Sequence, residues 1–280
     1  MPNPPMSITR TGRRIDGTPP AFHVASGMSY DISALLTDWD YQPGQVVARR
    51  FKGKDGTEKV QLRVDLGVLQ MNVEGRPDGK RPMGHETWYD FQRSRLETHR
   101  EEHQGDDSAF ELDSEGCGKL QQEAIQFHHR YICFFQLEDF ALVERDCERN
   151  LEVFEFVAEF AANEDLAWSL RQFAPQLLRM RTRARGTKAV RKRRHRDAIS
   201  AIEEGIEELE TFYRENGRED LLENSGEIAS LKHWLTEVRS KKPLTALEKL
   251  QRDLDEAIRL EDYERAAKVR DQMKKLQTSD

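Results

Sequence analysis

The chain has 280 residues, of which 37% are hydrophobic and 34% are charged, and its formal net charge is −7 at pH 7. A mean hydropathy of −0.81 is far on the polar side for a compact enzyme, so the composition argues against a single globular domain and indicates helix-rich or elongated parts. No apolar run approaches the roughly 18 residues that cross a bilayer, and the first residues lack the apolar segment of a signal peptide. We therefore expect a cytoplasmic protein with no membrane partner.

The N-terminal residues 1–28 hold five of the ten prolines and little apolar content, which predicts a disordered or loosely docked arm. Residues 29–100 have the pattern of a small β-rich module. Apolar residues alternate with polar ones along a predicted hairpin at Val60, Leu62, Val64 and Leu66. The alternation changes phase after Gly67, which predicts a bulge or bend at this point and a further strand beyond it.

The next residues, 101–118, are mostly polar, and we expect a linker there with a domain boundary inside it. From residue 119 to residue 240 apolar residues recur every three or four positions, which predicts a domain of helical hairpins. The chain has three cysteines and no CxxC pair, so we expect buried, reduced thiols rather than a disulfide framework or a zinc site. His99 and His103 are four positions apart, but Arg100 stands where a zinc protease needs its glutamate. We expect no catalytic centre, metal or cofactor.

One segment of the helical region is strongly basic. Residues 179–196 contain eight arginines, two lysines and no acidic residue. Such a block can bind a phosphate backbone without sequence preference. The candidate nucleic-acid-binding residues are Arg179, Arg181, Arg183, Arg185, Lys188, Arg191, Lys192, Arg193, Arg194 and Arg196. The alternative is a helix end or loop whose charges are paired with acidic neighbours such as Glu203–Glu210.

The pattern of residues 243–278 predicts a hairpin of two helices. Pro243 ends the preceding helix, and an apolar seam with coiled-coil spacing runs through Leu254 and Ala257. Asp262 follows the expected turn and is placed to cap the second helix through its carboxylate. The predicted protein-binding residues of this hairpin are Leu250, Leu254, Ala257, Ile258, Tyr263, Ala266, Ala267, Arg270 and Met273.

This hairpin resembles the UVR motif, the C-terminal helical hairpin of the nucleotide-excision-repair proteins UvrB and UvrC. The matching positions are Leu254, Ala257, Asp262-Tyr263-Glu264, Ala266-Ala267, Arg270-Asp271, Met273 and Leu276. In the repair proteins the UvrB hairpin pairs with the matching one in UvrC, so the resemblance implies a docking surface. The stretches Tyr30–Phe51 and Leu62–Gly79 also look similar to the N-terminal region of uncharacterised bacterial UVR-motif proteins. That second likeness implies a bacterial lineage and no activity.

Together these patterns predict an α+β protein. A small β-rich N-terminal module is followed by a mostly α-helical hairpin domain and a C-terminal UVR-like helical hairpin. The predicted function is that of a non-enzymatic adaptor, whose hairpin docks onto a partner protein or onto its own copy. The alternative is a nucleic-acid-associated factor linked to nucleotide excision repair, in which residues 179–196 contact the phosphate backbone.

Overall fold

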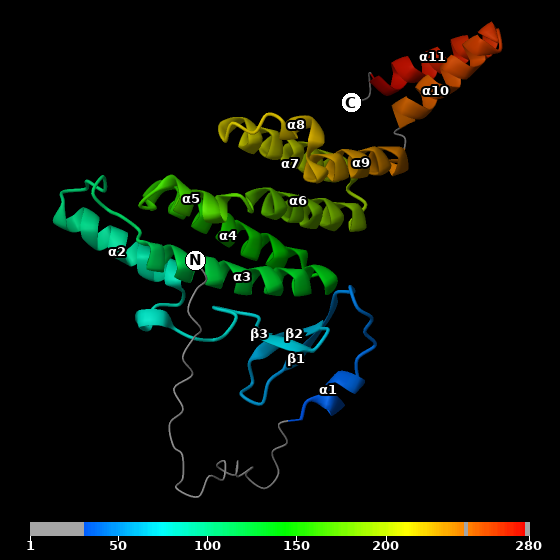
Figure 1. The fold of residues 1–280 in the computed structure, drawn as a ribbon. Helices are drawn as coiled ribbons and strands as arrows, with labels where there is room; N and C mark the ends of the chain where they lie inside the picture. The colour runs from blue at the N-terminus through cyan, green and yellow to red at the C-terminus, as the bar shows by residue number, and fades with distance from the viewer. Residues whose placement is uncertain (1–30, 244–245, 278–280) are drawn as a thin grey trace, which may run out of the picture.

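The computed structural model describes residues 31–243 and 246–277 (Figure 1), so the arm expected at residues 1–28 lies outside the described residues, as does residue 278. A three-stranded sheet comes first, and the rest is helical, which confirms the predicted α+β class. The strands are β1 Val47–Lys52, β2 Glu58–Val64 and β3 Gly67–Asn72. The first helices are α1 Ser33–Thr37, the short 3-10 helix η1 Pro82–Gly84, α2 Trp88–Glu102, α3 Ser114–Gln136 and α4 Phe140–Phe160. They are followed by α5 Glu164–Arg171, α6 Ala174–Arg191, α7 His195–Glu215, α8 Leu221–Asn224, α9 Gly226–Lys241, α10 Ala246–Arg259 and α11 Tyr263–Gln277.

The sheet is an antiparallel meander with β2 in its centre. Val60 and Leu62 of β2 are buried, as is Met71 of β3, because this face of the sheet packs against α3. The phase change in the apolar pattern has a different cause from the bulge that the sequence predicts. Val64 pairs with Gly67 across a tight turn, so the chain reverses between them and a new strand begins.

The helices beyond the sheet stack in layers, and each long helix packs on the next: α3 on α4, α4 on α6, α6 on α7 and α7 on α9 (Figure 1). One apolar core runs from the sheet into α3, α4, α5 and α6, and it includes both Val60 and Phe134. Leu112, inside the expected linker 101–118, is fully buried, and its N–H donates to the Phe160 carbonyl at 2.7 Å. The apolar core of the described residues therefore continues across the expected linker, and α3 covers the apolar face of the sheet.

A buried ion pair joins the sheet to the helices. The Arg130 guanidinium on α3 donates from Nε and Nη2 to the Asp146 carboxylate on α4, at 2.7 and 2.9 Å, and both side chains are 1% exposed. Its Nη1 also donates to the carbonyl of Asn72, the last residue of β3, and to that of Gly75 in the loop that follows. These bonds fix the loop after the sheet onto two helices at once.

The cysteines are free and buried, as the sequence predicts, and burial raises the pKa of the Cys133 thiol to about 12. Within residues 31–243 and 246–277, no helix combines the length and the apolar character that crossing a membrane requires.

Candidate functional site

The C-terminal hairpin consists of α10 and α11, joined by a turn whose geometry follows from local chemistry. The backbone N–H of Asp262 donates to the Ala257 carbonyl at 2.9 Å, and Glu261 takes a left-handed conformation with φ of 58°. The Asp262 carboxylate then accepts the backbone N–H of Arg265 at 3.0 Å. The predicted N-cap is thereby confirmed, and the chain direction reverses within three residues.

The interface between the two helices is small. Ala257 is fully buried, and Ala266 and Val269 are 9% and 8% exposed. Around them lie the half-buried side chains of Leu250, Leu254 and Met273. Five of the nine predicted protein-binding residues therefore lie at the contact between α10 and α11. The sequence-based site omits Val269, although it stands three positions after Ala266, on the same helical face.

The remaining four predicted residues are exposed to solvent. Ile258 is 53% exposed and Tyr263 is 71% exposed, and Ala267 and Arg270 are exposed as well. Tyr263, Ala267 and Arg270 follow one another at helical spacings of four and three, so they share one side of α11. On α10, Ile258 stands eleven positions after Leu247, which is 37% exposed and absent from the predicted set. A spacing of eleven residues also returns to the same side of a helix.

These side chains form one surface of the hairpin. In an antiparallel pair, the flank of α10 that carries Leu247 and Ile258 lies on the same side as the flank of α11 that carries Tyr263 and Ala267. On the opposite side, the ion pair between Arg265 and Glu256 (3.5 Å) bridges the two helices, and Leu276, eleven positions after Arg265, is 40% exposed there. We call Leu247, Ile258, Tyr263 and Ala267 the exposed apolar face.

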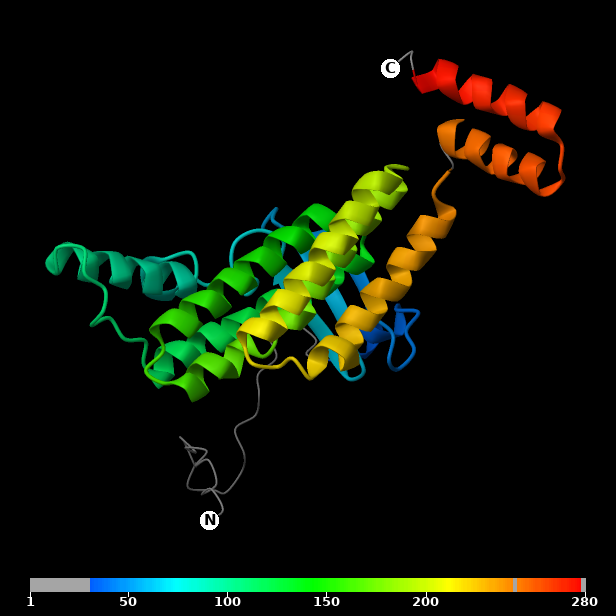
Figure 2. The ribbon, with the colours of Figure 1, turned by 90° about the horizontal axis from the view of Figure 1, so that it is seen from above.

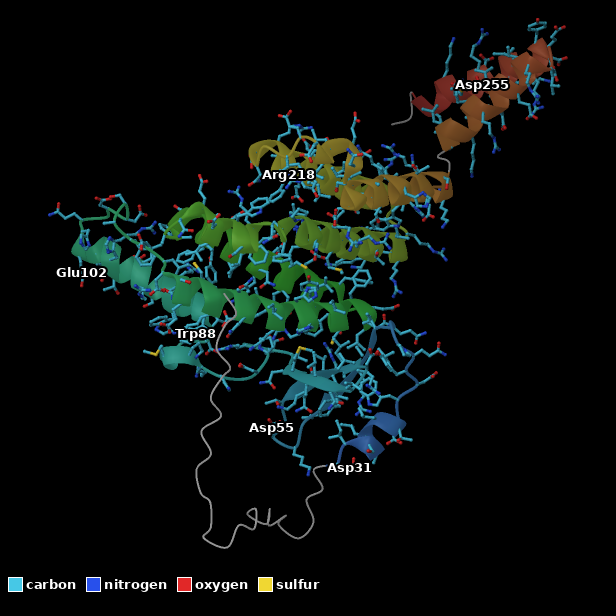
Figure 3. All side chains as sticks on the ribbon, viewed as in Figure 1. Asp31, Asp55, Trp88, Glu102, Arg218 and Asp255 are labelled. Carbon is cyan, nitrogen blue, oxygen red and sulfur yellow. The ribbon has the colours of Figure 1, made fainter. Side chains whose placement is uncertain are left out.

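The hairpin stands apart from the helical layers in two perpendicular views (Figures 1 and 2). Side chains project from it in all directions, including that of Asp255, and none of the other described elements lies against them in this view (Figure 3). Two-helix units of fewer than about 40 residues bury too little surface to be more than marginally stable alone. The exposed apolar face therefore has the most to gain from contact with another protein surface.

The basic segment has a different environment. Helix α6 packs between α4 and α7, and most of its cations are paired with carboxylates of the surrounding elements. The ion pairs are Arg181 with Glu208, Arg185 with Glu148, Lys188 with Glu144 and Arg191 with Glu138. The Arg183 guanidinium lies 4.2 Å from the ring centre of Trp234 on α9, and Arg179 is half-buried. The stretch Glu203–Glu210 supplies one of these carboxylates, as the alternative interpretation of the sequence holds.

Fewer basic side chains remain at the turn between α6 and α7. Lys192, Arg193 and Arg196 are exposed, and no ion pair involves them within the described part of the chain. Arg194 is exposed too, but it pairs with Asp197 at 2.7 Å. The accessible basic residues of the segment therefore form a small cationic turn and not a continuous basic face.

The described residues contain no group of three or more His, Cys, Asp or Glu side chains that could hold a metal ion, and His99 and His103 pair with each other. Their rings stack, with centroids 4.0 Å apart.

Comparison with known families agrees with the hairpin geometry. The family model described as the UvrB/uvrC motif matches residues 245–279, a stretch that contains both α10 and α11. The UVR motif predicted from the sequence is thereby confirmed. No curated protein and no solved structure matches the chain.

Proposed function

We propose that the protein is a non-enzymatic adaptor, whose UVR hairpin docks through its exposed apolar face onto a partner protein or onto a second copy of the chain. The observation that carries the proposal is the exposure of Ile258 (53%) and Tyr263 (71%) on a hairpin that packs against no other long helix within residues 31–243 and 246–277. Burying a large apolar side chain contributes about 1.5–3 kcal/mol, so a few such side chains offset much of the entropy lost on association.

Substitution of Ala267 by Glu tests this proposal. Ala267 lies on the exposed apolar face, so a carboxylate there costs less than about 1 kcal/mol in the free hairpin but about 2–5 kcal/mol in a desolvated interface where it has no partner. We expect the variant to lose the bound proteins or the oligomeric state of the wild-type chain, measured by pull-down and by light scattering after gel filtration. The matched control is Gln272→Glu, because Gln272 is exposed on the far side of the same helix.

The two variants separate docking from simple destabilisation. If Ala267→Glu and Gln272→Glu both retain the wild-type partners and oligomeric state, the hairpin has no docking function. If both lose them equally, the effect is not confined to the exposed apolar face, and the proposed surface is wrong.

A second candidate function is contact with nucleic acid, linked to excision repair. It is supported by the cationic turn between α6 and α7, where Lys192, Arg193 and Arg196 are exposed. Three cations can neutralise only a few phosphates, so this binding is expected to be weak and strongly salt-dependent.

A further inference from the structure

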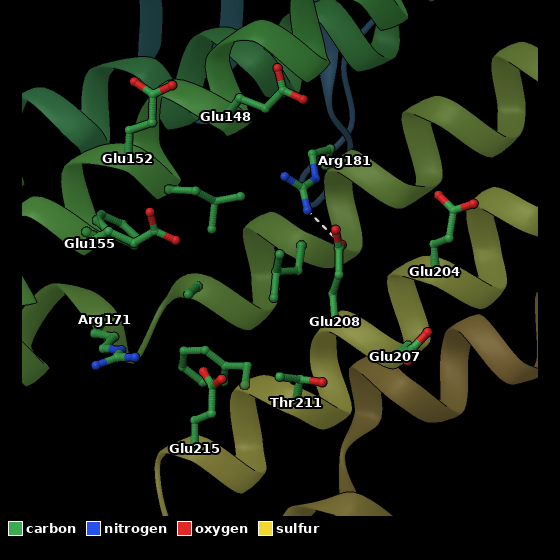
Figure 4. Close-up of a pocket in the computed structure, with 15 residues that line it drawn as sticks. Glu148, Glu152, Glu155, Arg171, Arg181, Glu204, Glu207, Glu208, Thr211 and Glu215 are labelled. Atoms are coloured by element: carbon green, nitrogen blue, oxygen red, sulfur yellow. Dashed lines mark hydrogen bonds and ion pairs between the residues drawn. The ribbon is translucent and has the colours of Figure 1, made fainter.

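An open groove lies on the helical body, between α4 and α7 and above α6 (Figure 4). Its volume is about 800 Å³. Its floor is apolar, because Leu151 and Phe154 of α4 approach Leu178 of α6 and Phe212 of α7 there. An apolar floor of this kind favours a segment of protein chain over a small ion.

The rim of the groove is acidic. Seven glutamates but only two arginines line it. Arg181 pairs with Glu208 across the groove at 2.7 Å, as the dashed line in Figure 4 marks. Within the described ranges, no ion pair involves Glu152, Glu155, Glu207 or Glu215. The groove is therefore complementary to an amphipathic helix that carries cations beside its apolar residues.

Helix α11 is such an amphipathic helix. Residues 263–277 contain five basic and two acidic residues. Tyr263 and Ala267 supply apolar surface on the same side as Arg270, which is exposed and belongs to no ion pair among the described residues. The helix also has a free side, because α10 is the only long helix in the described part of the chain that packs against it.

We propose that the acidic groove of one chain receives helix α11 of a second copy. This inference rests on the proposed docking function and narrows the partner to the chain itself. Tyr263 and Ala267 of the incoming helix cover the apolar floor, and Arg270 and the lysines near the end of α11 face the unpaired glutamates. If each chain inserts its hairpin into the other, the exchange is reciprocal and closes a two-fold dimer, so that no open filament forms.

A charge-swap experiment on the full-length chain tests this arrangement. The first variant reverses the charge of the groove through Glu155→Lys, Glu207→Lys and Glu215→Lys. The second reverses the charge of helix α11 through Arg270→Glu and Lys274→Glu. We expect each variant to weaken dimerisation at least about tenfold, since opposed charges at an interface are replaced by like charges. A third variant combines both sets, and we expect it to recover most of the wild-type affinity. Analytical ultracentrifugation over a range of concentrations measures the dissociation constants.

The control makes the same change in net charge outside the groove. Glu159, Glu219 and Glu223 are exposed and do not line the groove, so their replacement by Lys is expected to leave dimerisation unchanged. Recovery in the combined variant, together with an unaffected control, supports the proposal. A wild-type chain that stays monomeric at every concentration overturns it. It is also overturned if groove reversal has no effect while Ala267→Glu abolishes the dimer; in that case the hairpins pair directly, and the proposed docking function stands without the groove.

Discussion

Helices α6 and α11 are both rich in basic residues, but their environments differ. Helix α6 has neighbours on two sides, α4 and α7, and the carboxylates Glu148 and Glu208 of those helices pair with its arginines. Among the described helices, α11 packs against α10 alone, and the Lys268 cation pairs with Glu264 one turn earlier on its own helix. A run of basic residues is therefore accessible to another molecule only where the helix that carries it has a free side.

The largest expected effect concerns the charges of the helical body. Asp146→Ala leaves the Arg130 guanidinium, which is 1% exposed, without its carboxylate. We expect the free energy of unfolding to fall by about 3–5 kcal/mol, because an unpaired buried charge is left behind. Chemical denaturation measures this, with the exposed Glu159→Ala as control, for which the expected change is below about 0.5 kcal/mol. If Asp146→Ala lowers the free energy of unfolding by less than about 1 kcal/mol, water solvates the ion pair and the pair contributes little to the stability of the helical layers.

The second prediction concerns the close packing of helix α7 against helix α6. A Cβ atom on Gly205 of α7 would collide with the Thr182 side chain of α6. Gly205→Ala is therefore expected to lower the free energy of unfolding by about 1–3 kcal/mol through overpacking. Gly118 of α3 has no atom near its missing Cβ, so Gly118→Ala is expected to stabilise the helix by about 0.5–1 kcal/mol. Thermal unfolding measures the melting temperatures of both variants. If both temperatures rise or both fall, the close packing of α6 and α7 described here is wrong.

A third substitution tests which basic residues are accessible. Lys192→Gln, Arg193→Gln and Arg196→Gln together remove the exposed cationic turn and are expected to abolish retention on heparin or DNA at low salt. The control removes three paired cations instead, through Arg181→Gln, Arg185→Gln and Lys188→Gln. It is expected to leave retention largely intact, because these side chains already contact carboxylates. Equal loss in the two variants would mean that total charge decides retention and that the turn has no special role.

The smallest effect concerns the turn of the hairpin. Glu261 has φ of 58°, a conformation that glycine adopts without strain. Glu261→Gly is expected to stabilise the hairpin by about 0.5–1 kcal/mol and to leave the body unaffected. Hydrogen exchange of the α11 amides in the full-length chain resolves this local change, which global unfolding does not. Faster exchange in the variant would contradict the expected relief of strain.

Local chemistry explains which features the sequence predicts well. The cap at Asp262 and the small residues of the hairpin seam depend on neighbours within a few positions. The predicted alternation along β2 holds less well, because Gln61 is buried between Val60 and Leu62. The pairing of Arg185 with Glu148 joins residues 37 positions apart and depends on which helices become neighbours. The exposure of Tyr263 could not be read from the sequence either, since spacing places it on a helix side but does not say whether another element covers that side.

Thiol labelling in a full-length Ala267→Cys variant tests the central claim most directly. The native cysteines are buried, and burial raises the pKa of the Cys133 thiol to about 12, so they do not compete for the reagent. The control variant, Gln272→Cys, places its thiol about 140° around the same helix. If the exposed apolar face is a docking surface, labelling at position 267 slows as the protein is concentrated or mixed with extract of its source cells, while labelling at position 272 does not. Equal labelling rates at both positions under all of these conditions would contradict the account.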